Sequence, residues 1–94
     1  MPKAHINFDI PLILLKEGDI FVCMSPALDL VSHGDSYEDA VKSFRSTLSI
    51  FFAEIVKMGT LEKVLLDCGW QKIKRKFVPP QFIGEQNQSV QVAV

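Results

Sequence analysis

The sequence predicts an α+β domain: a three-stranded antiparallel meander crossed by one long helix, with a short second helix and one or two C-terminal strands. Two observations lead to this prediction, a period-two alternation of apolar residues in the first strand and a helical spacing of apolar residues over 36–58. The 94 residues, 48% of them apolar, suit a single domain over 1–94, with its core at 4–58 and an extension at 60–94. Domains this small often gain stability by oligomerising.

The first strand is predicted over residues 4–14, where every even position is apolar and therefore lies on one face. Pro11 cannot donate to a ladder, so this strand is expected at a sheet edge or with a bulge there. The apolar stripe consists of Ala4, Ile6, Phe8, Ile10, Leu12 and Leu14, and the other face carries His5, Asn7 and Asp9.

Two further strands are predicted before the long helix. Residues 16–19 supply a hairpin turn, and the apolar run 20–24 predicts a strand that is covered on both faces. After the break at Ser25-Pro26, residues 27–33 predict a third strand. Because the connections are short, a meander of the three strands is favoured.

The long helix is predicted over residues 36–58, because its apolar residues recur at intervals of three and four. Ser36 and Asp39 resemble a capping box, and Asp35 adds negative charge at the same terminus, where it compensates the helix dipole. Gly34 before a helix could in principle hold a phosphate, but these acids would repel an anion. A structural cap is therefore the preferred interpretation.

The last third of the chain predicts smaller elements. Thr60 and Gly69 bound a short second helix, and the alternation over 70–78 predicts a strand with a solvated, lysine-rich face. Residues 84–89 are linker-like. The apolar positions of 90–94 predict a final edge strand or a tail that pairs with another chain.

Charge, cysteines and the N-terminal sequence narrow the class of protein. The net charge is −1, with −4 on residues 1–71 and +3 on residues 72–94, so a general nucleic-acid binder is not expected. Cys23 and Cys68 lie outside CxxC and metal-binding spacings and are interpreted as buried thiols in a reducing compartment. No secretory signal or membrane span is expected, so we predict a cytoplasmic protein.

Residues 21–52 contain a pattern that is typical of one protein family; their sequence is FVCMSPALDLVSHGDSYEDAVKSFRSTLSIFF. An aromatic-led strand, a proline and a third strand precede the motif Ser-x-Gly-Asp-Ser-x-Glu-Asp-Ala, which opens the helix. This pattern resembles the HicB family of antitoxins, and the resemblance extends over residues 4–58. The matching positions are Phe21, Pro26, Ser32, Gly34, Asp35, Ser36, Glu38, Asp39 and Ala40.

The resemblance implies a partial ribonuclease H-like fold and a non-enzymatic role without a cofactor. It implies the antitoxin of a type II toxin–antitoxin pair, whose partner would be a small HicA-like ribonuclease toxin. The exposed strand edges add the expectation of a homo-oligomer, a dimer or higher. Leu28-Asp29-Leu30 stands where the family often has Leu-Pro-Gly, so the local turn must differ. Many HicB antitoxins carry a further DNA-binding domain, and DNA binding is not expected without one.

The basic stretch 72–76 is the main alternative functional feature. Trp70 and Phe77 flank it and could stack a base. Alternating lysines also protect a strand edge from unwanted pairing, and this structural interpretation is preferred. The alternatives to an antitoxin are therefore an RNA-binding module or an oligomeric scaffold. The candidate nucleic-acid contacts are Lys72, Lys74, Arg75 and Lys76.

An enzymatic function and a metal site are not predicted. Clustered acids could hold two metal ions, as in a nuclease, but strand parity and turns separate the acids of this chain. The two histidines, His5 and His33, lie on polar strand faces with no nucleophile placed beside them by spacing. Residues 65–76 also resemble part of a HicA toxin, but the catalytic Gly-Ser-His of those toxins is absent. The acids in question are Asp9, Asp19, Asp29 and Asp35.

Overall fold

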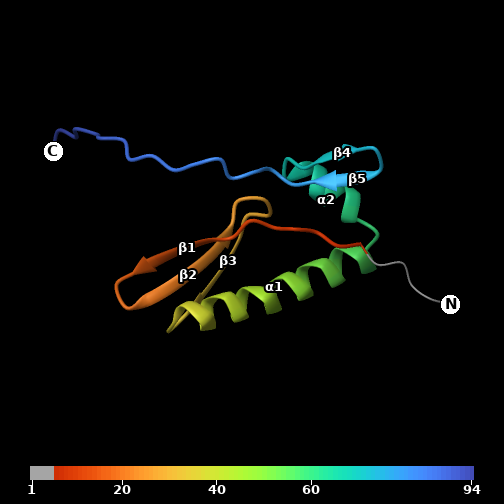
Figure 1. Ribbon diagram of the computed structural model, residues 1–94, viewed down its shortest axis with the longest axis horizontal. Coiled ribbons are helices and arrows are strands. Elements are labelled where there is room, and N and C mark those ends of the chain that lie inside the picture. The colour runs from red at the N-terminus through yellow and green to blue at the C-terminus, as the bar shows by residue number, and fades with distance from the viewer. Residues whose placement is uncertain (1–5) are drawn as a thin grey trace.

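A computed structural model describes residues 6–94 and shows a three-stranded antiparallel sheet with one long helix across it (Figure 1). The predicted α+β class, the meander and the crossing helix are confirmed. The elements in chain order are β1 (Ile13–Glu17), β2 (Ile20–Ser25), β3 (Leu30–Gly34), α1 (Tyr37–Lys57), α2 (Leu61–Asp67), β4 (Gln71–Ile73) and β5 (Lys76–Val78). The last two strands form a separate two-stranded sheet.

The first strand begins later than the sequence pattern predicts. β1 starts at Ile13, which pairs with Met24, while residues 6–12 lead into it outside the ladder. Since β2 ends one residue beyond Met24, no neighbouring strand is available to residues 6–11. The predicted positions Ala4 and His5 lie outside the described residues. Within the described part, the even positions from 8 to 14 pack inward as predicted, since Phe8, Ile10, Leu12 and Leu14 all contact the core, whereas Ile6 is 60% exposed and lies in neither cluster.

The third strand is also shorter than predicted, because residues 26–29 form a turn. The backbone N–H groups of Leu28 and Asp29 both donate to the carbonyl oxygen of Ser25, at 3.3 and 3.0 Å. Asp29 adopts a φ of 56°, in the left-handed region that aspartate tolerates better than most residues. Asp29 therefore lies in the turn and not on a strand face, and β3 begins at Leu30.

The long helix α1 begins and ends at the capping residues that its sequence predicts. Ser36 is the N-cap, and its Oγ accepts a hydrogen bond from the backbone N–H of Asp39 at 3.1 Å. At the other end Gly59 has a φ of 70°, which lets the chain leave the helix after Met58. Thr60, in contrast, makes no side-chain cap for α2, and its hydroxyl donates to the carbonyl oxygen of Ile55 instead.

Two clusters of buried side chains hold the molecule together. One lies between the sheet and the first half of α1 and is formed by Cys23, Ala40 and Phe44. The other joins the β2–β3 turn to the C-terminal part of the chain through Ala27, Leu28, Leu65 and Trp70. The Trp70 indole N–H donates to the carbonyl oxygen of Ala27 at 2.7 Å, in a buried position. Trp70 therefore fixes α2 and the β4–β5 hairpin to the main sheet.

The C-terminal region departs from the predicted pattern at two places. Residues 71–78 form a hairpin and not a single strand, since Ile73 pairs with Lys76 across a turn made by Lys74 and Arg75. Both turn residues have positive φ, 50° and 69°, a geometry for which Asn-Gly is the usual sequence signal. Residues 90–94 form no edge strand in the described chain and are exposed. Of the helices within residues 6–94, none is long and apolar enough to cross a bilayer.

Candidate functional site

The sheet face opposite α1 is largely apolar, and no element within residues 6–94 forms a layer over it. Leu14, Cys23 and Ser32 are paired across the three strands and face the helix, so the alternate residues point away from it. Leu15, Ile20 and Val31 of this second face are 45%, 47% and 54% exposed. The predicted coverage of residues 20–24 on both faces therefore fails at Ile20, whereas Val22 and Cys23 are buried. We call this surface the outer face; its apolar residues are Ile13, Leu15, Ile20, Met24 and Val31, together with Val22, which is only 5% exposed.

An apolar outer face is unusual for a two-layer α+β domain. The solvated side of an antiparallel sheet normally carries polar residues that alternate with the core positions. Here only His33 breaks the apolar character of the middle and third strands on this side. Contiguous apolar surface rimmed by polar residues marks interaction sites in soluble proteins. The outer face is therefore the strongest candidate for a partner-binding surface.

Five carboxylates lie at one end of the molecule, beside the β1–β2 turn and around the start of α1, with Lys16 near them. The β1–β2 turn lies next to the end of β3, because Phe21 pairs with both Lys16 and Gly34. Neither of the two ion pairs found within residues 6–94 involves a carboxylate from this end. A shallow hollow of about 570 Å³ between His33, Asp35, Asp39 and Ser43 opens at the same place. We call this region the acidic end; its carboxylates are Glu17, Asp19, Asp35, Glu38 and Asp39.

The helix N-terminus at the acidic end is structural. Gly34 lies so close to α1 that a Cβ atom on it would meet the backbone nitrogen of Ala40 and lie 2.7 Å from the carbonyl carbon of Asp39. The Ser36 hydroxyl oxygen accepts the hydrogen bond of the Asp39 backbone N–H, so this donor is not free for a ligand. Asp35, Glu38 and Asp39 surround the terminus with negative charge. These observations favour the capping interpretation of Asp35, Ser36 and Asp39 over anion binding.

The basic residues predicted as nucleic-acid contacts lie on the β4–β5 hairpin. Lys74 and Arg75 form its exposed tip. Lys72 pairs with Glu62 at 3.2 Å, and its Nζ lies 5.5 Å from the ring centroid of Phe77. Trp70 is 3% exposed and bonded to Ala27, so it is not available to stack a base. The hairpin thus concentrates positive charge, and Phe77 is the aromatic residue left beside it.

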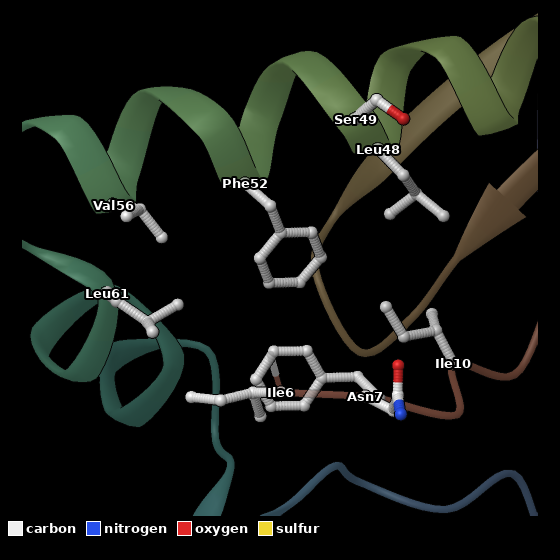
Figure 2. Close-up of a pocket in the computed structure, with 9 residues that line it drawn as sticks. Ile6, Asn7, Ile10, Leu48, Ser49, Phe52, Val56 and Leu61 are labelled. Carbon is white, nitrogen blue, oxygen red and sulfur yellow. The ribbon is translucent and has the colours of Figure 1, made fainter. Parts of the chain in front are cut away.

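An apolar pocket of about 510 Å³ lies between residues 6–10, the second half of α1 and the start of α2 (Figure 2). Phe8 and Phe52 stack on one another with ring centroids 5.3 Å apart. Figure 2 shows Val56 and Leu61 facing the same space from α1 and α2. The sequence pattern predicts that Phe8 and Phe52 lie in the core, but it does not predict a pocket beside them.

The remaining candidates from the sequence do not assemble into a catalytic centre. Within residues 6–94 no three His, Cys, Asp or Glu side chains form a group that could hold a metal ion. Asp9 precedes the sheet, whereas Asp19 and Asp29 occupy two different turns and Asp35 precedes α1. His33 is exposed on the outer face, and His5 lies outside the described residues.

The two cysteines are free thiols. Cys23 is fully buried, and burial raises the pKa of its thiol. Cys68 is half-buried; burial raises its pKa most, and the negative charges of Asp67 and Asp29 add to the effect. A raised pKa keeps a thiol protonated near neutral pH, so neither cysteine has the properties of a nucleophile or a metal ligand.

Comparisons of the chain with models of protein families, with characterised proteins and with solved structures find no match.

Proposed function

We propose that this chain is a HicB-like, non-enzymatic protein-binding domain, the antitoxin of a type II toxin–antitoxin pair that sequesters a small HicA-like ribonuclease toxin. The observation that carries the proposal is the uncovered outer face. The motif around Gly34 and Ser36 supports the family, since both residues have the structural roles that a strand-to-helix junction requires. The proposal includes self-association of the chain and a location in the cytoplasm.

The outer face has the composition of an interface centre. Protein–protein interfaces of standard size bury about 800 Å² on each partner, with an apolar centre and a polar rim. The outer face offers five partly or fully exposed apolar side chains on three adjacent strands, with the buried Val22 among them and the acidic end beside them. The antiparallel sheet also holds these side chains in fixed positions, so little conformational entropy is lost when a partner binds.

The charge beside the outer face fits a basic partner. A ribonuclease must bind phosphates, so its RNA-binding surface carries lysine and arginine. A surface rimmed by the carboxylates of the acidic end complements such a partner, which favours fast and selective association. Binding there would cover the partner's RNA-binding surface, and this is how a protein without catalytic groups can inhibit a ribonuclease.

Lysines on the outer face are expected to abolish partner binding. The partner to use is a purified HicA-like toxin, the class of protein that the proposal names, and the measurement is calorimetric titration. The double variant Leu15→Lys/Val31→Lys places two positive charges in an apolar surface that meets a basic partner. We expect affinity to fall at least about 100-fold.

The matched control puts the same two changes elsewhere. Ile50 and Ile73 are 71% and 49% exposed and lie on α1 and β4, away from the outer face. The variant Ile50→Lys/Ile73→Lys should bind as the wild type does. Equal affinities for both double variants would contradict the proposal, provided that circular dichroism shows all three proteins to be folded.

The basic hairpin supports a second candidate function, binding of RNA. The observation that favours it is the concentration of Lys72, Lys74, Arg75 and Lys76 on two short strands and an exposed turn. Phosphate contacts weaken steeply with salt. Filter binding of a single-stranded RNA across a salt series should therefore show a steep loss of affinity for the wild type, and a shallower loss for Lys74→Ala/Arg75→Ala. No binding at low salt would eliminate this candidate.

A further inference from the structure

The C-terminal arm, residues 81–94, extends away from the rest of the molecule (Figure 1). Every residue of the arm is exposed, and Ile83, Val90 and Val92 are 94%, 76% and 69% exposed. The radius of gyration of the chain is 16.3 Å, against about 12 Å for a compact domain of this length. The difference arises because the arm projects from an otherwise compact body.

The arm has the sequence of a strand without a sheet. Its last residues, SVQVAV, alternate apolar valines with small or polar residues, and β-branched valine favours extended backbone. Glu85 is the single charged side chain of the arm. The charged residues that usually keep exposed strands from pairing are therefore almost absent. An isolated strand of this kind gains stability by pairing with a free sheet edge.

A free edge lies at the start of the chain. Among the described residues 6–94, β1 pairs only with β2, so its other side is open there, and residues 6–12 continue from it outside any ladder. No backbone hydrogen bond is found for residues 6–12 in the described chain. Such a segment can accept an added strand through its own N–H and C=O groups, which is a common mode of peptide recognition.

The apolar pocket lies directly beside this edge. Ile6, Phe8 and Ile10 line it from the edge segment, and Phe52 and Val56 line it from α1 (Figure 2). Because side chains alternate along a strand, every second residue of an added strand would point toward this pocket. Val90, Val92 and Val94 have this spacing. One segment can therefore form backbone hydrogen bonds with the free edge and fill the pocket with its valine side chains.

The arm of the same molecule is directed away from that pocket. It starts beside the edge segment, at a hollow lined by Asp9, Pro11, Pro80 and Phe82. The Pro79-Pro80 pair favours an extended continuation, and the arm runs past the β1–β2 turn (Figure 1). At about 3.3 Å per residue, the 14 residues of the arm span about 46 Å, enough to reach a neighbouring molecule.

Charge complementarity favours a second copy of the chain as that neighbour. The acidic end and the basic β4–β5 hairpin lie at opposite ends of the molecule (Figure 1). Two copies placed side by side in opposite directions bring the acidic end of each against the basic hairpin of the other. The same placement carries each arm toward the end of the other copy where the pocket opens.

We infer that the chain forms a dimer by reciprocal exchange of its C-terminal arms. Residues 90–94 of each copy add as a strand along residues 6–12 of the other, and the valines enter the apolar pocket. This inference rests on the self-association included in the proposed function and names the segments that produce it. The interface is separate from the outer face, which stays free for the partner.

The test is sedimentation velocity over a concentration series, with matched variants on both sides of the contact. The wild type should sediment as a dimer of twice 10.6 kDa. Val90→Asp/Val92→Asp places charges in the pocket and should raise the dimer dissociation constant at least about 30-fold. Val56→Asp, on the pocket wall, should do the same. The controls Gln91→Asp/Ala93→Asp and Ile50→Asp carry the same charges outside the pocket and should change it less than about threefold.

The outcomes separate this inference from the proposed function. A wild-type chain that stays monomeric, or a dimer that the arm and pocket variants leave intact, would overturn arm exchange. A dimer that Leu15→Lys/Val31→Lys dissociates while the arm variants do not would overturn it too, since the outer face would then be the self-association surface. Partner binding by a monomeric Val90→Asp/Val92→Asp variant would leave the proposed function in place.

Discussion

Replacement of Trp70 by alanine is expected to destabilise the domain by about 3–5 kcal/mol. The side chain is 3% exposed and lies in the cluster of Ala27, Leu28 and Leu65, with Phe8 against its ring edge at 5.3 Å between centroids. The change leaves a large cavity and removes the donor to the Ala27 carbonyl. Since small domains have about 5–15 kcal/mol of stability in total, much of it would be lost.

Urea denaturation followed by circular dichroism measures this effect. The variant Trp70→Phe serves as the control, because its phenyl ring retains most of the apolar volume but cannot donate the hydrogen bond that the indole N–H makes to Ala27. It should cost less than Trp70→Ala, about 1–3 kcal/mol, chiefly from the unpaired Ala27 carbonyl. If Trp70→Ala unfolds at the same urea concentration as the wild type, the C-terminal part of the chain is not fixed to the sheet as described.

Replacement of Gly34 by alanine is expected to be the most damaging single-methyl change in the chain. The added Cβ would collide with the backbone nitrogen of Ala40 and lie 2.8 Å from the Asp39 Cβ. Backbone atoms cannot move aside as a flexible side chain can, so the start of α1 must shift away from β3. We expect a loss of about 3 kcal/mol, at the upper end of what overpacking costs.

The control for this prediction is Gly84→Ala. No atom lies within 4 Å of a Cβ built on Gly84, so this variant should melt within about 1 °C of the wild type. Thermal unfolding of both variants gives the comparison. A Gly34→Ala protein as stable as Gly84→Ala would show that β3 and α1 do not approach as closely as the structure has them. The glycine of the Ser-x-Gly-Asp motif would then have no structural explanation.

Sequence periodicity was sufficient for the elements whose stability is local. α1 combines a helical apolar stripe with a serine N-cap and a glycine stop, and all three signals act within a few residues. The strand ends were harder to predict, because they depend on neighbours. The apolar alternation continues through residues 6–12, but the ladder stops where β2 turns away at Ser25. The Lys74-Arg75 turn was missed because neither residue is typical of positive φ.

The exposure of the outer face does not follow from the apolar pattern of its strands alone. Residues 12–15 and 20–24 are apolar at every position. For 20–24 such a run predicts a strand that is buried on both sides. A three-stranded sheet with one long helix buries one face fully, so Leu15, Ile20 and Val31 of the other face stay exposed, while Val22 between them is buried. The sequence predicts one long helix for a sheet with two faces, and this mismatch indicates that one face is left without a covering helix. The open pocket beside residues 6–10 could not be found in this way, because it depends on how α2 packs beside α1.

Inhibition of RNA cleavage is the measurement that tests the central claim most directly. The ribonuclease is a HicA-like toxin, the partner that the proposed function names, and its cleavage of a labelled RNA is followed at increasing concentrations of the domain. The account predicts that the wild type and Ile50→Lys/Ile73→Lys suppress cleavage equally, whereas Leu15→Lys/Val31→Lys requires at least about 100-fold more protein. Equal inhibition by all three proteins, or cleavage that the wild type leaves unchanged, would contradict the claim that the outer face binds and blocks a ribonuclease.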